Sequence, residues 1–398
     1  MSVPGALDGI RVLDFSIVVQ GPQCAAMLAD LGADVVKIER KDYGDIARLI
    51  PISATDRRSA YFFTCNRGKR SLALDVTTRA GLEVALRLIE SADVMVSAFV
   101  PGVMERLGLG YDVCSAINPR LVYATASALG TRGPDAGRKG VDLVGQAVGG
   151  LMSTTGQDGE FPTPVGAVIA DSAGGMTLCV GILAALLNRE RTGRGQCVDA
   201  SLLGGQIWQQ ASEISFYLAG GRNSERANRG HAFLPAIYRV FATRDGHLVI
   251  AGVSEREREG FLRALGSPEL ANDPRFATAA GVLGNLGEVF NALEPIFRER
   301  TTAEWVERLG AENQRFSPVN DYKAVAEYEQ AYANGYLRRV EHPEWGAMSI
   351  VGSPVSLSDT PANPAAWAPA LGQHTEEVLL EAGYSWDDIG RLREDGAI

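Results

Sequence analysis

Cysteine is scarce in this sequence, and no two cysteines have paired spacing. The chain has five of them, and none forms a C-x-x-C motif: Cys24, Cys65, Cys114, Cys179 and Cys197. An odd count without such spacing argues against a disulfide framework and against a zinc site. It is typical of a protein of the reducing cytoplasm, and we predict that localisation and no bound metal.

Positive charge and membrane signals are also missing. The net charge is −10, which argues against a general nucleic-acid binder, although a few local arginines could still bind an anion. Residues 1–9 do not combine a basic segment with an apolar one, so no signal peptide is expected. The apolar segment 176–187 is interrupted by Gly181 and is too short for a convincing membrane span. We therefore predict neither a nucleic-acid partner nor a membrane.

The 398 residues exceed one ordinary core, and the pattern of the first third predicts an α/β domain. Apolar runs typical of buried strands alternate with amphipathic helical segments. The strands are expected at residues 10–15, 34–39, 71–74, 93–97 and 121–124. Such alternation predicts a mostly parallel sheet, whose ligands lie at the carboxyl ends of the strands.

The character of the chain changes after residue 220. A hairpin is expected around Asp245-Gly246, followed by several helical segments, which together predict a smaller α+β domain. The predicted boundaries are a large domain made of 1–200 with 335–398, a small domain at 225–330, and linkers at 201–224 and 331–345.

One aspartate stands out for its surroundings. An apolar run leads to Asp171, small residues surround it, and a helix is expected from about 174 to 188. Asp171 could simply cap that helix, because aspartate is a favoured N-cap residue. Alternatively, small neighbours leave its carboxylate open to a bulky substrate, beside a helix end that favours an anion.

Several phrases of the sequence together decide between these alternatives. They occur in order over about residues 10–200, and they are the segments 13–15, 21–22, 31–39, 66–75, 101–108, 164–175 and 192–199. In this combination the sequence resembles the class III CoA-transferases, which include formyl-CoA transferase and carnitine CoA-transferase and are related to the α-methylacyl-CoA racemases.

The resemblance implies a fold and a mechanism. It implies a Rossmann-like large domain, a smaller second domain, and a homodimer in which two ring-like chains interlock. The aspartate that matches Asp171 would attack the thioester of an acyl-CoA. Catalysis would then pass through an aspartyl–acyl anhydride and an aspartyl-CoA thioester. A carboxylate that is ionised at pH 7 needs no general base for this attack. Coenzyme A enters as part of the substrate, and no permanently bound cofactor is required.

Two other readings of the resemblance are open. Racemases of this fold carry a His-Asp pair where this chain has Val141-Asp142, and valine cannot move a proton. This substitution favours a transferase over a racemase-like isomerase. A non-catalytic CoA-binding protein that kept the fold is the other alternative, and retention of Asp171 speaks against it.

The resemblance also suggests binding residues. The family's catalytic glutamine matches Val19, so either Gln20 takes its place or the contact is missing. Asp142 matches an acidic residue near the reactive carboxylate. The remaining matches are to residues expected around CoA, and they are Val18, Arg40, Leu74, Phe99, Arg106, Leu107 and Lys139. Arginine suits the phosphates of CoA because it offers two parallel hydrogen bonds.

The second domain and three arginines bear on which acids are exchanged. Formyl-CoA transferases carry a run of four glycines in the second domain, where this chain has the bulkier, more basic segment 228–235. Arg48, Arg226 and Arg229 could hold the second carboxylate of a dicarboxylic substrate. We therefore expect succinyl-CoA or another dicarboxylyl-CoA as donor.

Overall fold

The computed structural model describes residues 4–365 and 367–398, and the chain divides into two compact units. The first unit contains the residues up to 150 together with 165–210 and 329–398, and the second contains 151–164 and 211–328. The segment 151–164, predicted to lie in the large domain, joins the second unit, where Thr154 accepts a backbone hydrogen bond from Ala227. Part of the predicted linker 201–224 is the helix α10 (Ala211–Gly220) of that unit.

A six-stranded, all-parallel sheet forms the centre of the first unit, as the strand pattern predicts. Its order is β3-β2-β1-β4-β5-β6, the order of a doubly wound Rossmann-like sheet. The strands are β1 (Arg11–Asp14), β2 (Asp34–Glu39), β3 (Arg70–Ala73), β4 (Val94–Ser97), β5 (Val122–Ser127) and β6 (Cys197–Ser201). The chain runs outward from β1 on one side and from β4 on the other. The carboxyl ends of these two strands therefore flank the point where ligands bind in such sheets.

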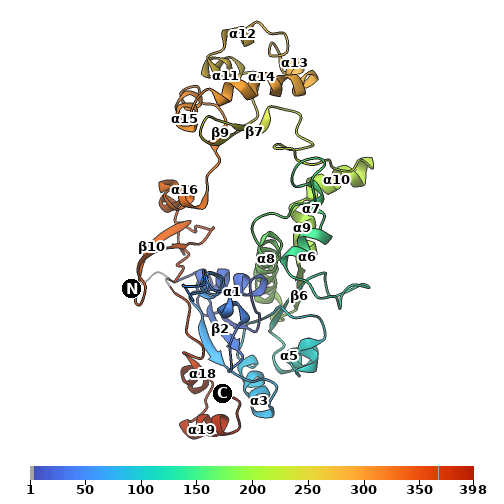
Figure 1. Cartoon of the computed structure of the whole chain (residues 1–398). Helices are drawn as coiled ribbons and strands as arrows, with labels where there is room; N and C mark the ends of the chain where they lie inside the picture. The colour runs from blue at the N-terminus through green and yellow to red at the C-terminus, as the bar shows by residue number, and fades with distance from the viewer. Residues whose placement is uncertain (1–3, 366) are drawn as a thin grey trace. The chain divides into compact units, whose positions relative to one another are not determined.

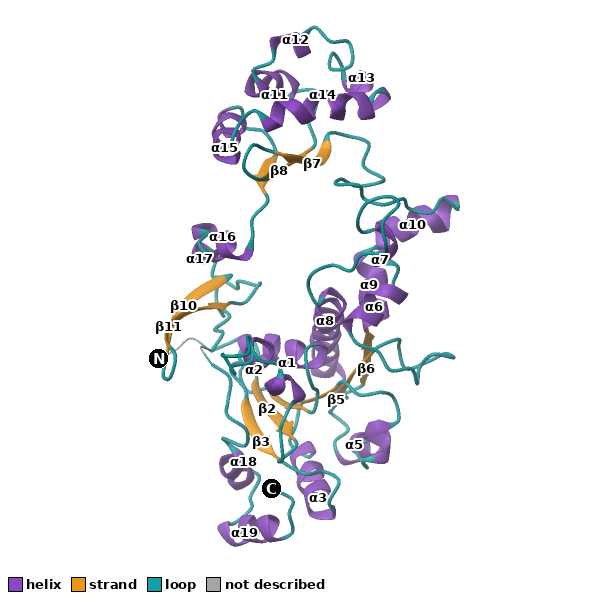
Figure 2. Cartoon of the chain, in the orientation of Figure 1, coloured by secondary structure: helices purple, strands orange, loops and turns teal. Residues whose placement is uncertain are grey.

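Two apolar cores cover the two faces of this sheet, because alternate residues of a strand point to opposite sides. Leu13 and Met95 point to the face covered by α3, α5, α18 and α19. Val12 and Val94 point to the face covered by α1 and α8. The result is a three-layer arrangement (Figures 1 and 2).

The helices of the first unit follow the strands along the chain. Their bounds are α1 (Gln20–Asp30), a 3₁₀ helix η1 (Ile46–Leu49), α2 (Ala60–Asn66), α3 (Arg79–Ile89), α4 (Val103–Arg106), α5 (Tyr111–Ile117), α6 (Asp142–Val148), α8 (Ile169–Thr192), α9 (Leu202–Gln209), α17 (Glu329–Ala333), α18 (Thr375–Glu381) and α19 (Trp386–Glu394). The unit also contains an antiparallel hairpin, β10 (Leu337–His342) with β11 (Gly346–Val351).

The second unit is an α+β structure with its own apolar core. The predicted hairpin is confirmed as β7 (Tyr238–Ala242) and β8 (His247–Ala251), and β9 (Phe316–Pro318) adds a third antiparallel strand. The helices are α7 (Leu151–Thr154), α10, α11 (Arg258–Leu265), α12 (Pro268–Ala271), α13 (Ala279–Gly284), α14 (Leu286–Arg298), α15 (Thr302–Ala311) and α16 (Tyr322–Ala326). The core centres on Trp305, whose indole N–H donates to the carbonyl of Phe297 over 2.8 Å.

Helix α8 is longer than the sequence indicates, with 24 residues in place of the expected segment from about 174 to 188. By length and composition alone it could cross a membrane, and half of its most apolar window is buried in the protein. It packs against α1, α9, β5 and β6, which is the environment of a core helix. Its extension toward the N-terminus places Asp171 inside the first turn of the helix.

Candidate active site

A cleft of about 580 Å³ opens at the carboxyl ends of β1, β4 and β5, all in the first unit. Its walls come from the segments that follow these strands and from the start of α6 and α8. The polar and charged side chains at this cleft include Gln20, Ser127, Arg138, Asp142 and Asp171. The fold therefore brings together Gln20, Asp142 and Asp171. Gln20 precedes Asp142 by 122 positions, and Asp142 precedes Asp171 by 29.

Asp171 does not cap α8, which removes the alternative explanation for this residue. The N-cap position is Val168, and it makes no side-chain cap hydrogen bond. Asp142 of α6 does this work instead, because its Oδ1 accepts the backbone N–H of Ala170 over 2.7 Å and of Asp171 over 3.2 Å. The carboxylate of Asp171 is therefore not needed to satisfy the free N–H groups of the helix.

Gln146 fixes Asp142 in this position. Its Nε2 donates to Asp142 Oδ2 over 2.6 Å, and its Oε1 accepts the backbone N–H of Val165 over 2.9 Å. Gln146 is 1% exposed, so the link between α6 and the segment leading into α8 is buried. Asp142 thus lies near Asp171, as expected, because it caps the helix that carries Asp171.

The pKa of Asp171 differs from the expectation of an ordinary ionised aspartate. Burial first, and then the negative charge of Asp142, raise the pKa of Asp171 to about 7. A pKa near neutrality makes the charge of Asp171 sensitive to its surroundings at neutral pH. A strongly raised pKa in a cleft is a common property of catalytic carboxyl groups.

Gln20 lies against the helix of Asp171. It is the first residue of α1, it is 7% exposed, and its Nε2 has no hydrogen-bond partner among the described residues. A Cβ added at Gly174 would come within 2.4 Å of this nitrogen, so the amide sits beside Gly174, three residues beyond Asp171. At Gly175 an added Cβ would come within 2.7 Å of the Gln20 carbonyl oxygen. The small residues after Asp171 thus make room for α1, in addition to leaving the carboxylate approachable.

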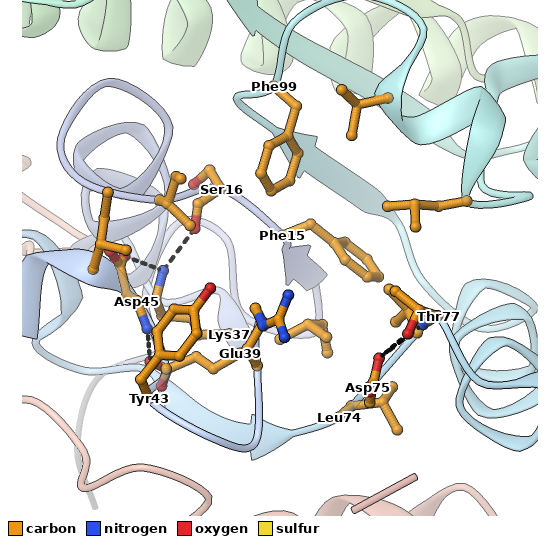
Figure 3. Close-up of a pocket in the computed structure, with 18 of the residues that line it drawn as sticks. Phe15, Ser16, Lys37, Glu39, Tyr43, Asp45, Leu74, Asp75, Thr77 and Phe99 are labelled. Atoms are coloured by element: carbon orange, nitrogen blue, oxygen red, sulfur yellow. Dashed lines mark hydrogen bonds and ion pairs between the residues drawn. The ribbon is translucent and has the colours of Figure 1, made fainter.

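A second cavity of about 300 Å³ adjoins the cleft, and Ile17, Ile46 and Phe99 line both. Figure 3 shows this cavity with Phe15, Tyr43 and Leu74 around it. Four of the residues predicted around CoA line this cavity, namely Arg40, Leu74, Phe99 and Leu107, and a fifth, Val18, lines the cleft. A continuous wall of this kind suits an elongated ligand with an apolar middle.

Arg40 and Arg106 differ in their position. Arg40 lines the cavity with 57% of its side chain exposed, and it pairs only loosely with Asp42 at 3.4 Å. Arg106, the last residue of α4, is exposed and lines neither the cavity nor the cleft. Lys139 is also exposed and lines neither, whereas its neighbour Arg138 lines the cleft.

The substrate role predicted for Arg48 does not fit its surroundings. Its Nε and Nη2 donate to the two carboxylate oxygens of Glu39 over 2.8 and 2.7 Å, and Nη2 also reaches the carbonyl of Pro369 over 3.1 Å. The guanidinium lies 3.6 Å from the centre of the Phe62 ring. This bidentate pair with a buried carboxylate engages the Arg48 guanidinium within the fold, and the substrate role of Arg48 stays a prediction from the resemblance.

Arg226 and Arg229 belong to the second unit and are also engaged. Arg226 donates to the carbonyls of Thr155 and, over 3.1 Å, Glu160, which holds the segment 151–164 to this unit. Arg229 has a positive φ of 69° and pairs with Glu294 at 3.1 Å. Their contacts are those of structural residues rather than of free carboxylate ligands.

Two further residues of the site escape sequence reasoning. Asp45 is almost fully buried and lines the cavity, and Arg138 lines the cleft. Asp45 follows a Gly44 turn that reads as an ordinary loop, and Arg138 stands in a polar stretch beside Lys139. The one sequence feature that points to Asp45 is its residue type, because aspartate is a favoured N-cap residue. In the structure it caps η1 and accepts the N–H of Ala47 over 2.8 Å.

Comparison with known proteins identifies the family of this chain. The sequence profile of CoA-transferase family III matches residues 7–375. The chain belongs to CoA-transferase family III. This CoA-transferase is 36% identical to the formyl-CoA:oxalate CoA-transferase of Streptomyces coelicolor, over 99% of each chain. It is 31% identical to the human succinyl-CoA:glutarate CoA-transferase, over 98% of this chain and 90% of that protein.

Solved structures of relatives have the same fold as this CoA-transferase. A CAIB/BAIF family protein from Brucella suis aligns with a TM-score of 0.85 and 31% identity, over 95% of this chain and all of that one. A protein from Mycobacterium tuberculosis aligns with a TM-score of 0.82 and 31% identity, over 94% and 99% of the two chains. The family assignment and the Rossmann-like fold are therefore confirmed, and CoA thioesters are the substrates of this enzyme class.

Proposed function

We propose that this family III CoA-transferase moves CoA between two carboxylic acids by covalent catalysis at Asp171. The observation that carries the proposal is the carboxylate of Asp171, which is not used to cap α8 and lies in a cleft at the switch point of the sheet, beside a second cavity. Asp142 supplies the helix cap, so the carboxylate of Asp171 can react without weakening α8.

The proposed reaction balances without a cofactor. An oxygen of Asp171 attacks the acyl carbonyl carbon, a C–O bond forms, the C–S bond breaks, and CoA leaves as a thiolate. The thiolate attacks the Cγ of Asp171 in the mixed anhydride and releases the donor acid as a carboxylate. The acceptor carboxylate then attacks the aspartyl-CoA thioester, and the same two steps run in reverse to regenerate Asp171. No proton or electron is gained or lost overall.

Gln20 is the proposed hydrogen-bond donor to the oxyanions that form in these steps. Its amide is buried, has an N–H group without a partner among the described residues, and lies beside Gly174, which follows Asp171 by about one turn of α8. A preorganised donor of this kind stabilises charge only when charge develops on the substrate. We assign the family's glutamine role to Gln20.

The cavity beside the cleft is the proposed site for the pantetheine and nucleotide of CoA. Leu74, Phe99 and Leu107 offer apolar surface, and Arg40 offers an exposed cation for phosphate. Arg106 and Lys139 remain predictions from the resemblance for the more distant phosphates, because neither lines the cavity.

A dicarboxylyl-CoA such as succinyl-CoA is the proposed donor. The support comes from the mammalian relatives named succinyl-CoA:glutarate CoA-transferases, which are 31–33% identical to this chain. Arg138 joins Arg48, Arg226 and Arg229 as a proposed partner of the second carboxylate, since it lines the cleft itself. Its pair with Asp135, at 2.9 Å, is exposed to solvent on both sides. Formate and oxalate are the competing pair, because a relative named formyl-CoA:oxalate CoA-transferase is 36% identical to this chain.

We also propose that the enzyme is a cytoplasmic homodimer. An exposed apolar stripe runs along α8, where Met176, Val180 and Leu187 are 42%, 67% and 57% exposed, and a second copy of the chain would cover it. Sedimentation of the wild type and of Val180→Glu tests this assignment. A wild type that sediments as a monomer would refute it.

Trapping the covalent intermediate tests the mechanism. Incubation with succinyl-CoA should add the mass of a succinyl or CoA group to the intact protein, and hydroxylamine should convert the adduct to a hydroxamate at residue 171. The adduct should be absent from Asp171→Asn. Glutarate or oxalate should give an adduct only when an acyl-CoA is also present, so that CoA can move between the two acids. If rapid quenching detects no adduct while CoA transfer proceeds, the covalent mechanism is wrong and CoA moves directly between the two acids.

A further inference from the structure

Val18 has a backbone conformation that its side chain disfavours. Its φ is +67°, in the left-handed region that β-branched residues rarely occupy. Val18 lies between β1 and α1 and lines the cleft of Asp171, two residues before Gln20. Strain of this kind persists only where the surroundings impose it, and it concentrates at functional sites.

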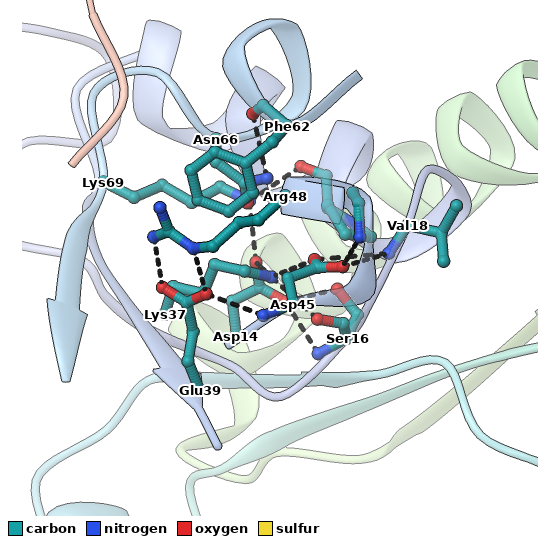
Figure 4. A network of polar contacts seen from close by, with 12 residues as sticks. Asp14, Ser16, Val18, Lys37, Glu39, Asp45, Arg48, Phe62, Asn66 and Lys69 are labelled. Atoms are coloured by element: carbon teal, nitrogen blue, oxygen red, sulfur yellow. Dashed lines mark hydrogen bonds and ion pairs between the residues drawn. The ribbon is translucent and has the colours of Figure 1, made fainter. Parts of the chain in front are cut away.

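Asp45 accepts the backbone N–H of this strained residue. The backbone N–H of Val18 points at both oxygens of its carboxylate, at 3.1 and 3.2 Å. The same carboxylate accepts the N–H of Ala47 over 2.8 Å, and Asp45 is 1% exposed. Figure 4 shows Asp45 between Val18 and Lys37. A buried, charge-assisted hydrogen bond of this kind holds the peptide of Val18 in place.

Lys37 anchors Asp45 from the sheet. Its ammonium lies 2.9 Å from Asp45 Oδ2, 2.8 Å from the carbonyl of Ser16 and 3.8 Å from Asp14 Oδ2. Lys69 in turn lies 2.7 Å from Asp14, and the side chains of all four charged residues are fully buried. Burying so many charges costs more free energy than burying apolar residues of similar size would. A specific local geometry is what such a network can supply in return.

The network joins the walls of the two cavities. Asp45 lines the cavity assigned to CoA, Val18 lines the cleft of Asp171, and Ile46 lines both. The loop after β2 is thereby hydrogen-bonded to the loop after β1. The position of Gln20 at the start of α1 depends on the direction in which the chain leaves Val18.

We propose that Asp45 is a positioning residue, which holds Val18 in the left-handed conformation so that the segment 17–20 presents Gln20 to the acyl-CoA. This inference rests on the proposed function, but it concerns a residue that touches neither the thioester nor Asp171. Loss of Asp45 should let Val18 relax toward negative φ and move the start of α1.

A double-mutant cycle tests the inference. Glycine adopts a positive φ without strain, so Val18→Gly removes the need for an imposed conformation. Asp45→Ala should lower kcat by about tenfold or more in the protein with Val18, and by less than about threefold in the Val18→Gly background. The KM for acyl-CoA should change less than kcat. Equal losses in both backgrounds would overturn the inference.

Two variants separate positioning from a general loss of stability. Asp30 forms a buried ion pair with Arg67 at 2.5 Å, away from both cavities, so Asp30→Ala should cost the same in both backgrounds. Asp45→Asn keeps an oxygen for the Val18 N–H and should retain more of kcat than Asp45→Ala. It also replaces Asp45→Ala in the cycle if that protein does not fold.

Hydrogen exchange distinguishes a failure of this inference from a failure of the proposed function. The amide of Val18 should exchange faster in Asp45→Ala than in the wild type, and at the wild-type rate in Asp30→Ala, whether or not the protein transfers CoA. A wild type that transfers no CoA would refute the function alone. Unchanged exchange at Val18 in an active Asp45→Ala protein would refute the positioning role alone.

Discussion

Asp142 caps the helix that carries Asp171, and it does so from a different helix. Its Oδ1 lies 2.7 Å from the N of Ala170 and 3.2 Å from the N of Asp171 itself. The same charge contributes to the raised pKa of Asp171, after the effect of burial. One carboxylate thus stabilises the start of α8 and disfavours ionisation of the other, so the two residues should respond differently to mutation.

Asp171→Asn should abolish CoA transfer and stabilise the protein at pH 8. A folded-state pKa of about 7 lies above the value of an unfolded aspartate, so ionisation costs stability as the pH rises. Removing the charge should therefore raise the free energy of unfolding by about 2 kcal/mol, a figure reduced for partial solvent exposure. Urea unfolding measured from pH 4 to pH 8 checks this.

The stability difference has a required pH dependence. Wild type and Asp171→Asn should unfold alike near pH 4, where Asp171 is protonated in the folded protein, and the difference should grow as the pH rises to about 7. A difference of the same size at every pH would mean that the substitution acts through packing and not through the charge.

The rate of transfer should depend on the same ionisation. The nucleophile is the carboxylate, so kcat/KM should fall as the pH drops below about 7 and level off above it. Asp142→Asn removes one cause of the raised pKa while its remaining side-chain oxygen can still accept the N–H of Ala170. Its profile should therefore shift to lower pH. A profile that is flat between about pH 5 and 8 in the wild type would contradict this assignment.

Gln20 and Gly174 should act as one unit. Gln20→Ala should lower kcat by about 10²-fold with little change in the KM for acyl-CoA, because its amide acts on charge that develops during the reaction. Gly174→Ala places a methyl group within 2.4 Å of Gln20 Nε2 and should displace the amide with a similar loss. The double variant should be no worse than either single one, as steady-state kinetics will measure.

A matched glycine supplies the control for this pair. An added Cβ at Gly166 meets no atom within 4 Å, and this glycine has no positive φ, so Gly166→Ala should transfer CoA at the wild-type rate. If the losses from Gln20→Ala and Gly174→Ala multiply in the double variant, the two residues act independently and Gly174 does not position the amide.

The sequence predicted the parts of this protein that follow from local patterns. Buried strands such as 34–39 and the hairpin around Asp245 have strong periodic and turn signals, and the structure confirms them. The strand β6, the hairpin β10–β11 and the helix α19 were missed. Cys197–Ser201 contains Asp199 and Ser201 and no fully buried residue, so it lacks the apolar run of the other strands. The segment after residue 335 has many prolines that suggest irregular structure.

The partners of charged side chains were not predictable from the sequence. Arg48 is a plausible ligand for a carboxylate, but its partner is Glu39, which also accepts the backbone N–H of Asp45 in the turn between them. The helix cap by Asp142 depends on a contact across 28 residues, and α8 begins two residues before Asp171 rather than after it. Such relationships arise from tertiary packing, which has no local signature.

Arg40 and Arg48 should separate ligand binding from stability. Arg40→Ala should raise the KM for acyl-CoA about tenfold, since a charge-assisted contact to phosphate is lost, and leave the midpoint of thermal unfolding nearly unchanged. Arg48→Ala should do the reverse, because it leaves the fully buried carboxylate of Glu39 without its cation, at a cost of about 3 kcal/mol. Kinetics and thermal unfolding of both variants decide the matter. An Arg48→Ala protein of wild-type stability with a raised KM for dicarboxylates would restore Arg48 as a substrate residue.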